Sequence, residues 1–238
     1  MKRLMRYRII SGSVVEVRDA FFRTGKGEKR GPRKGPSTKR QIERNDRERV
    51  KRLARVINCN FGPGDLWLTL TYADNRLPID RRAAEKELAR FLRKAGKLHK
   101  AKHGVPLRYI AVTADKNSKT GEPCRLHHHL VMDRMGWELL TELWPKEQMS
   151  YKLLDGRRDY TGVARYMMQN VGREKGRRAF SASHGLKKPV ITAPYPVARA
   201  GSVQLPKGAD VREKEVHEDK EEGFFAAYVR YVTPEGTP

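Results

Sequence analysis

The sequence has few of the features that secreted, disulfide-rich or membrane proteins need. Its 238 residues include two cysteines, Cys59 and Cys124, which cannot build a disulfide framework and agree with a reducing compartment. No apolar run approaches the roughly 20 residues of a membrane-spanning helix. The basic start, MKRLMRYRII, is followed by SGSVVEVRD instead of the apolar stretch of a signal peptide. We therefore expect a cytoplasmic protein without a membrane partner.

Acidic residues are also scarce. The chain holds 51 Lys and Arg against 28 Asp and Glu, a formal net charge of +23. Such a charge favours a polyanionic partner, because Lys and Arg that neutralise phosphates release condensed counterions. Nucleic acid is therefore the expected partner. The hydrophobic fraction of 38% suffices for one core, and the length allows one domain with extensions or two small domains.

The positive charge is concentrated at the N-terminus. Residues 1–60 contain 19 Lys and Arg against 6 Asp and Glu. They begin with a strand or hairpin pattern, continue as a Gly-, Pro- and Lys/Arg-rich segment from Lys26 to Arg40, and end in a helix that Ser37 or Thr38 can cap. The Gly62-Pro63-Gly64 break closes this part. We interpret residues 1–64 as a basic N-terminal extension.

From Asp65 the sequence follows a compact α+β pattern. The order of elements predicts an antiparallel sheet with flanking helices. We assign residues 65–190 to this domain and residues 191–238 to a C-terminal extension. Its final strand, FFAAYVRYV, returns to the sheet or to the N-terminal strand. The expected elements are strands at 65–72, 107–113, 125–132 and 148–154, and helices at 80–100, 137–144 and 159–171.

The strand RLHHHLVM carries three consecutive histidines. Alternate side chains of a strand share a face, so His127 and His129 point one way and His128 joins the apolar residues on the other. Two such imidazoles can meet one divalent metal. A polar strand edge or a hydrogen-bonded core feature would also explain the cluster. A zinc site using Cys124 and His127 is weaker, because positions three apart on a strand face opposite sides.

A carboxylate can complete the metal site. If the turn before this strand centres near residues 119–121, Asp115 lies close to Arg125 or His127 across the ladder, and Glu122 is a substitute. Two imidazoles and a hard oxygen suit Mg²⁺ or Mn²⁺ at a phosphate. An ordinary turn residue is the alternative for Asp115.

Tyr166 lies off the apolar arc of its expected helix, with Gln169 and Arg173. A tyrosine that points away from the buried stripe can act as a nucleophile or stack on a base. A half-buried surface tyrosine is the alternative.

Four segments together carry a family resemblance: LTLTY at 68–72, RLHHHLVM, ARYMMQ and SASHGLKKP. They resemble the rolling-circle replication initiators (Rep proteins) of the HUH endonuclease superfamily, encoded by phages, plasmids and integrated elements in bacteria. The resemblance runs from about Asp65 to Pro189. It implies a five-stranded antiparallel sheet with flanking helices, His127 and His129 as metal ligands, and Tyr166 as the nucleophile.

The implied activity is site-specific nicking of single-stranded origin DNA in a bacterial host cell. Tyr166 would form a 5′-phosphotyrosyl bond and release a 3′-OH that primes host polymerase, with a host helicase as a further partner and no small-molecule substrate. His127, His129 and Asp115 would hold Mg²⁺ or Mn²⁺. The residues expected to contact DNA are Thr69, Thr71, Arg125, Arg165, Gln169, Arg173 and Lys175.

The chain departs from the family pattern at three points. Gln169 stands where the motif has a lysine three residues after the tyrosine, so Arg165, Arg173 or Lys175 would supply that cation. Asp115 is one methylene shorter than the usual Glu ligand. No second tyrosine lies one turn from Tyr166, which implies a single nucleophile. A relaxase or single-strand transposase of the same superfamily, or a non-catalytic basic nucleic-acid-binding protein, remains open.

Overall fold

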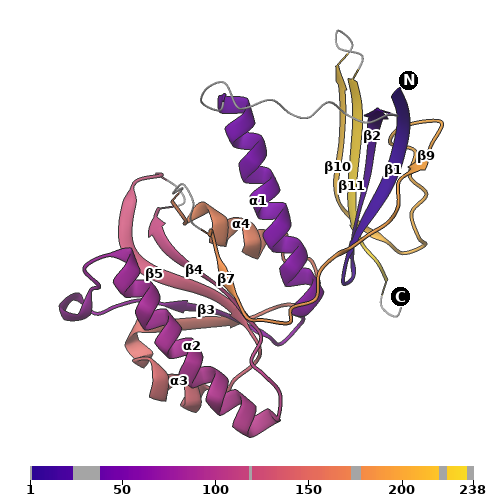
Figure 1. Ribbon diagram of the computed structural model, residues 1–238. Coiled ribbons are helices and arrows are strands. Elements are labelled where there is room, and N and C mark those ends of the chain that lie inside the picture. Colours follow the sequence, from indigo (N-terminus) through magenta and orange to yellow (C-terminus); the bar gives the residue numbers. More distant parts are fainter. Residues whose placement is uncertain (1, 24–37, 118–119, 173–177, 220–223, 235–238) are drawn as a thin grey trace. The chain divides into compact units, whose positions relative to one another are not determined.

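The computed structural model describes residues 2–23, 38–117, 120–172, 178–219 and 224–234 (Figure 1). The chain forms two compact units: one combines residues 1–48 with 188–238, and the other comprises residues 49–187. The boundary between the units falls inside the first helix, α1 (Lys39–Asn60). At the start of this helix, Thr38 Oγ1 accepts a hydrogen bond from the Gln41 amide. Among the described residues, no helix is both long enough and apolar enough to span a bilayer.

The unit of residues 49–187 is built on a five-stranded antiparallel sheet in the order β6-β3-β5-β4-β7. The helices α2 and α3 contribute to the core on one face of this sheet, and α4 and the second half of α1 contribute to the core on the other (Figure 1). Short 3-10 turns at Asp74–Arg76 and Lys146–Gln148 precede α2 and β6. The bounds are β3 (Leu66–Leu70), α2 (Arg81–His103), β4 (Tyr109–Lys116), β5 (Pro123–Met132), α3 (Trp137–Leu143), β6 (Met149–Leu153), α4 (Thr161–Gln169) and β7 (Ser181–Ala182).

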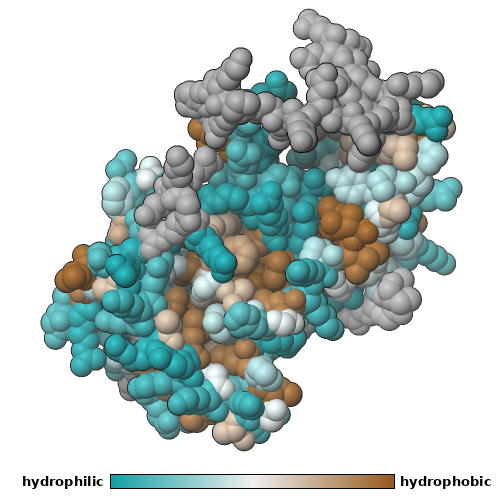
Figure 2. Space-filling model, in the orientation of Figure 1, coloured by the Kyte–Doolittle hydropathy of each residue, from teal (hydrophilic) through white to brown (hydrophobic). Residues whose placement is uncertain are grey.

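Alternation along the central strands separates the two cores. Leu66, Leu68 and Leu70 of β3 are buried against α2 and α3, while Trp67 and Thr69 face the side of α4. Burial of apolar surface on both faces fixes the register of the sheet, because a shift by one residue would exchange the two faces. In Figure 2 hydrophilic residues cover the outside of α2, and hydrophobic residues show beside it. The sheet therefore presents a defined set of side chains on each face.

The longest helix of this unit has both ends capped. Asp80 Oδ1 accepts a hydrogen bond of 2.7 Å from the Ala83 amide, which satisfies one unpaired donor of the first turn of α2. Gly104 ends the helix with φ of 72°, a left-handed conformation that glycine adopts without a steric penalty.

The other unit contains a second antiparallel sheet in the order β10-β11-β2-β1-β8, with β9 also paired to β1. Arg6 and Asp19 form a buried bidentate ion pair on neighbouring strands, with N–O distances of 2.7 and 2.8 Å. A small core of Val15, Val17, Val229 and Tyr231 lies on this sheet. The bounds are β1 (Lys2–Ser11), β2 (Val14–Arg23), β8 (Val190–Ile191), β9 (Tyr195–Pro196), β10 (Asp210–Asp219) and β11 (Phe224–Val232).

The α+β class and the five-stranded antiparallel sheet with flanking helices are confirmed. The final strand returns to the N-terminal hairpin, since β11 pairs with β2 from Val14 to Asp19. A separate basic N-terminal extension is not confirmed: β1 and β2 belong to the second sheet, and residues 24–37 of the Lys-rich segment lie outside the described residues. The assignment of residues 65–190 to one endonuclease domain remains a prediction.

Candidate active site

The centre of the candidate site is the histidine pair on β5. His127 and His129 project from the same face, with ring centroids 4.7 Å apart and their Nε2 atoms 3.0 Å apart. Across the ladder, His127 lies opposite Ala114 and His129 lies opposite Thr69 and Val112. The alternation expected from the sequence thus brings the two imidazoles together.

Hydrogen bonds on the far side of each ring orient the pair. His127 Nδ1 donates to the carbonyl oxygen of Arg125 at 2.9 Å, which leaves the lone pair on His127 Nε2. His129 Nδ1 lies 3.0 Å from Thr69 Oγ1. Because a hydroxyl can donate or accept, Thr69 supports either tautomer of His129. Both Nε2 atoms can therefore turn their lone pairs toward a common ligand.

Burial keeps the inner histidine neutral. His129 is 2% exposed, and desolvation, aided by the neighbouring His127, lowers the pKa of His129 to about 3. A neutral imidazole is the form that binds a metal.

Tyr166 lies directly against this pair. Its ring forms an edge contact with His129 at a centroid distance of 4.9 Å and a second with Trp67 at 5.6 Å. With 40% of its surface exposed, the side chain is open to solvent. The structure thus brings together His127, His129 and Tyr166, from β5 and α4.

The local sequence explains why Tyr166 faces this way. Ala164, Met167 and Met168 are buried on one side of α4, so Tyr166 falls outside the buried side. Asp159 Oδ1 accepts hydrogen bonds from the amide and hydroxyl of Thr161 and stabilises the first turn.

The neighbouring tyrosine, Tyr160, has a different environment. It is 3% exposed, its hydroxyl donates to the Asp155 carbonyl at 2.9 Å, and burial raises its pKa to about 12. A buried, hydrogen-bonded phenol is a poor nucleophile, so Tyr160 is the weaker candidate.

Asp115 takes part in other contacts. Its carboxylate forms an ion pair with Arg81 and accepts a 2.7 Å hydrogen bond from the Gly172 amide. A register shift between Ala114 and Lys116 places Asp115 at an irregularity of the ladder, where the additional residues belong to β5. No cluster of three His, Cys, Asp or Glu side chains able to hold a metal occurs in the described part of the chain. The ligand role of Asp115 remains a prediction that requires its carboxylate to leave Arg81.

The histidine pair by itself fits two adjacent ligand positions of a divalent ion. Two nitrogens bound at about 2.1 Å and at right angles would lie roughly 3 Å apart, as the two Nε2 atoms do. The carbonyl and hydroxyl partners of the opposite ring nitrogens match the arrangement that orients metal-binding histidines. The described residues thus place two candidate metal ligands side by side.

The residues expected to contact DNA are placed as follows. The Thr69 hydroxyl is bound to His129, and the Thr71 hydroxyl donates to the Gln148 carbonyl at 3.0 Å. Arg125 pairs with Asp74 at 2.5 Å and donates to the Tyr72 carbonyl. Arg165 and Gln169 are exposed on α4, and Arg173 and Lys175 lie outside the described residues.

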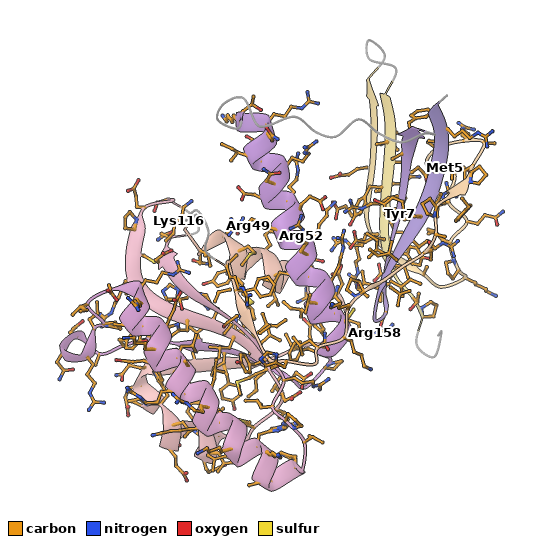
Figure 3. The ribbon with its side chains drawn as sticks, in the orientation of Figure 1. Met5, Tyr7, Arg49, Arg52, Lys116 and Arg158 are labelled. Atoms are coloured by element: carbon orange, nitrogen blue, oxygen red, sulfur yellow. The ribbon has the colours of Figure 1, made fainter. Side chains whose placement is uncertain are left out.

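Basic side chains also project from elements that flank this face of the sheet. Figure 3 shows Arg49 and Arg52 on α1 and Lys116 at the end of β4. The residues of α1 that follow them, Leu53 and Ile57, pack in the same core as α4.

Sequence reasoning missed two neighbours of the site and one buried network. Trp67 could have been found, since it shares a strand face with Thr69, but nothing in the sequence indicates the pairing of Arg81 with Asp115. His128 is fully buried, with Nε2 2.6 Å from the Tyr72 hydroxyl and Nδ1 3.1 Å from Thr113 Oγ1.

Comparison with known proteins gives one finding. The model of the replication-associated protein (ORF2) family matches residues 65–174, a range that runs from β3 past α4 and contains both histidines and Tyr166. No curated protein and no solved structure matches the chain. The match supports a role in replication initiation, with DNA as the partner.

Proposed function

We propose that this chain is a single-strand DNA endonuclease and ligase of the HUH type, which nicks origin DNA to start rolling-circle replication. The observation that carries the proposal is the contact of the exposed Tyr166 ring with His129, whose Nε2 meets that of His127. A nucleophile and two imidazoles that can bind a metal then lie close enough together to act on the same phosphate. The match to a replication-associated family over the same residues agrees with it.

The reaction is a transesterification. The Tyr166 hydroxyl loses its proton and attacks the scissile phosphorus, the bond from phosphorus to the 3′ oxygen breaks, and that oxygen takes up a proton. The products are a 5′-phosphotyrosyl DNA and a free 3′-OH. Because the phosphodiester is exchanged for another ester, attack by a 3′-OH can reverse the step and reseal the strand without an energy source.

The chain's own residues hold and orient the reacting groups. His127 and His129 would hold Mg²⁺ or Mn²⁺, which withdraws charge from the scissile phosphate when bound. Thr69 and the Arg125 carbonyl fix the two rings. Trp67 supports the Tyr166 ring through its edge contact. Arg165, Arg49 and Arg52 offer positive charge for the DNA backbone.

The substrate would be single-stranded origin DNA, and the released 3′-OH would be extended by host polymerase with a host helicase opening the duplex. Gln169 occupies the position where the family motif has a lysine and can hydrogen-bond a phosphate without neutralising it. A slower enzyme is the consequence we expect.

The test is formation of a covalent protein–DNA adduct. Labelled single-stranded oligonucleotides that tile the encoding replicon are incubated with protein and Mn²⁺ and denatured, and a slow-migrating labelled species is sought. We expect an adduct with the wild type and with Tyr160→Phe, and none with Tyr166→Phe or in excess chelator. Tyr166→Phe should still bind the same oligonucleotide.

Two outcomes would contradict the proposal. An adduct that persists in Tyr166→Phe would assign the attack to another residue. Failure of the wild type to form an adduct on any tile would favour a non-catalytic DNA-binding role.

A further inference from the structure

A second feature of residues 49–187 is a cavity of about 500 Å³ beside the core under α2, here called the α2 pocket. Tyr72, Phe91 and Trp144 form its inner wall and are each less than 10% exposed. Leu77, which is 42% exposed, lines it from the loop after β3. The volume lies in the range of about 300–1,000 Å³ typical of ligand sites.

The outer part of the α2 pocket is cationic. Arg76, Arg90 and Lys94 line it together with one carboxylate, that of Glu87. Arg90 and Lys94 are one turn apart and exposed on the same side of α2. None of the three cations forms a hydrogen bond or ion pair with any other described residue. Unpaired cations gathered around a cavity with an apolar wall suit a ligand that combines a phosphate with a flat apolar group.

The inner wall of the α2 pocket belongs to the core under α2 and α3, on the sheet face opposite α4, and the pocket reaches the chain that follows β3. Thr71 lines it and follows Thr69, the partner of His129, by two residues of extended chain. At roughly 3.3 Å per residue this step is about 7 Å.

We propose that the α2 pocket binds one nucleotide of the single-stranded substrate, where the strand passes the end of β3. Arg90, Lys94 and Arg76 hold its phosphate, and its base lies against Leu77 and the inner wall. The inference rests on the proposed function for the identity of the strand. The pocket thereby adds affinity, and a base preference, outside the histidine–tyrosine site.

The phosphate contact is tested by salt dependence in the full-length protein. Affinity for a labelled oligothymidylate of about 12 nucleotides is measured by fluorescence anisotropy over a range of salt. Arg90→Gln with Lys94→Gln should reduce the slope of log K against log salt by about 1.4, since each lost contact with a single strand removes about 0.7. The matched control is Arg93→Gln with Lys97→Gln, which has the same helix, spacing and charge change but lies outside the pocket.

The base contact is tested with an abasic oligomer that has the same number of phosphates. Leu77→Ala should reduce the preference for oligothymidylate over the abasic oligomer by severalfold. The matched control is Ile79→Ala in the same loop, which is 95% exposed and does not line the pocket. All six replaced side chains are exposed, so their replacement should leave folding intact.

The proposal holds if the pocket variants show these changes and their controls do not. Equal slopes in the two double variants would overturn it, as would an unchanged base preference in Leu77→Ala. Oligomer binding needs no strand cleavage. A failed adduct test with a positive binding test would therefore reject the nicking activity and retain the pocket.

Discussion

Replacing His128 should change the stability of the fold without changing metal binding. The His128 side chain is fully buried between the Tyr72 hydroxyl and Thr113 Oγ1, on the face opposite His127 and His129. His128→Leu removes the imidazole that hydrogen-bonds both hydroxyls and leaves an apolar side chain in its place. The Thr113 hydroxyl then has no partner among the described residues, and the Tyr72 hydroxyl keeps only a 3.5 Å contact with the Ala84 carbonyl. Each lost hydrogen bond of a buried hydroxyl costs about 1–3 kcal/mol, and the added apolar burial offsets part of that. We expect a net loss of about 2–4 kcal/mol in the free energy of unfolding.

A double-variant cycle can assign this loss to the hydrogen bonds. Replacing both partners by apolar groups is much less costly than removing one, so Tyr72→Phe with His128→Leu should recover about 1–3 kcal/mol of the loss. The outward-facing control is His127→Leu, which should cost less than about 1 kcal/mol but abolish Mn²⁺ binding. His128→Leu should retain it.

Tryptophan fluorescence during urea unfolding suits this measurement, because Trp67, Trp137 and Trp144 all lie within residues 49–187. Mn²⁺ binding is followed by calorimetry on the folded variants. The reasoning fails if His128→Leu is neutral, if Tyr72→Phe gives no recovery, or if His128→Leu loses Mn²⁺ binding while His127→Leu keeps it.

Three further predictions follow from the site and the charge distribution. Stability of the metal-free protein should fall as the pH drops from about 6.5 toward 3, because burial lowers the pKa of His128 and His129 to about 3 and both take up protons on unfolding. The free energy of unfolding, measured with urea, should change by up to about 1.4 kcal/mol per pH unit for each histidine. His128→Leu should remove one of the two contributions, and a stability that does not change with pH would contradict this prediction. His127→Ala with His129→Ala should abolish divalent-dependent adduct formation yet leave DNA affinity within severalfold of the wild type, as an electrophoretic mobility shift can show, because distributed charge carries that affinity. Deleting residues 26–36 should flatten the salt dependence of DNA binding, and an unchanged slope would show that the segment does not contact DNA.

Much of the fold could be predicted because the alternation of apolar residues, the strand pairing and the helix caps all favour the same elements. The alternation of Leu66, Leu68 and Leu70 with polar or aromatic residues fixes the two faces of β3, and pairing with β5 then fixes which histidines point outward. Asp80 at the start and Gly104 after the end of α2 bound a helix whose apolar stripe is continuous. Burial of their apolar side chains stabilises these locally favoured elements in the folded protein.

The second sheet was harder to anticipate. β2 pairs with β11, more than 200 residues away, and periodicity carries no information on the partner of a strand. The buried ion pair of Arg6 and Asp19 also contradicts the usual exposure of charged residues. From the sequence, these charges indicated only a basic extension.

The position of the Asp115 carboxylate could not be predicted from regular strand geometry. Continued pairing from Ala114 and His127 would place Asp115 opposite Leu126, but the register shifts after Ala114, and this one residue of β4 faces three residues of β5. The Asn170 carbonyl, at the end of α4, accepts hydrogen bonds from both the Asp115 and Lys116 amides, so this end of β4 and the end of α4 are joined. Arg81 and the Gly172 amide bind the carboxylate there. The backbone that sets the position of Tyr166 is therefore the same backbone that turns Asp115 toward Arg81. Any rearrangement that brought Asp115 to the histidine pair would have to break an ion pair and would pull on the end of α4.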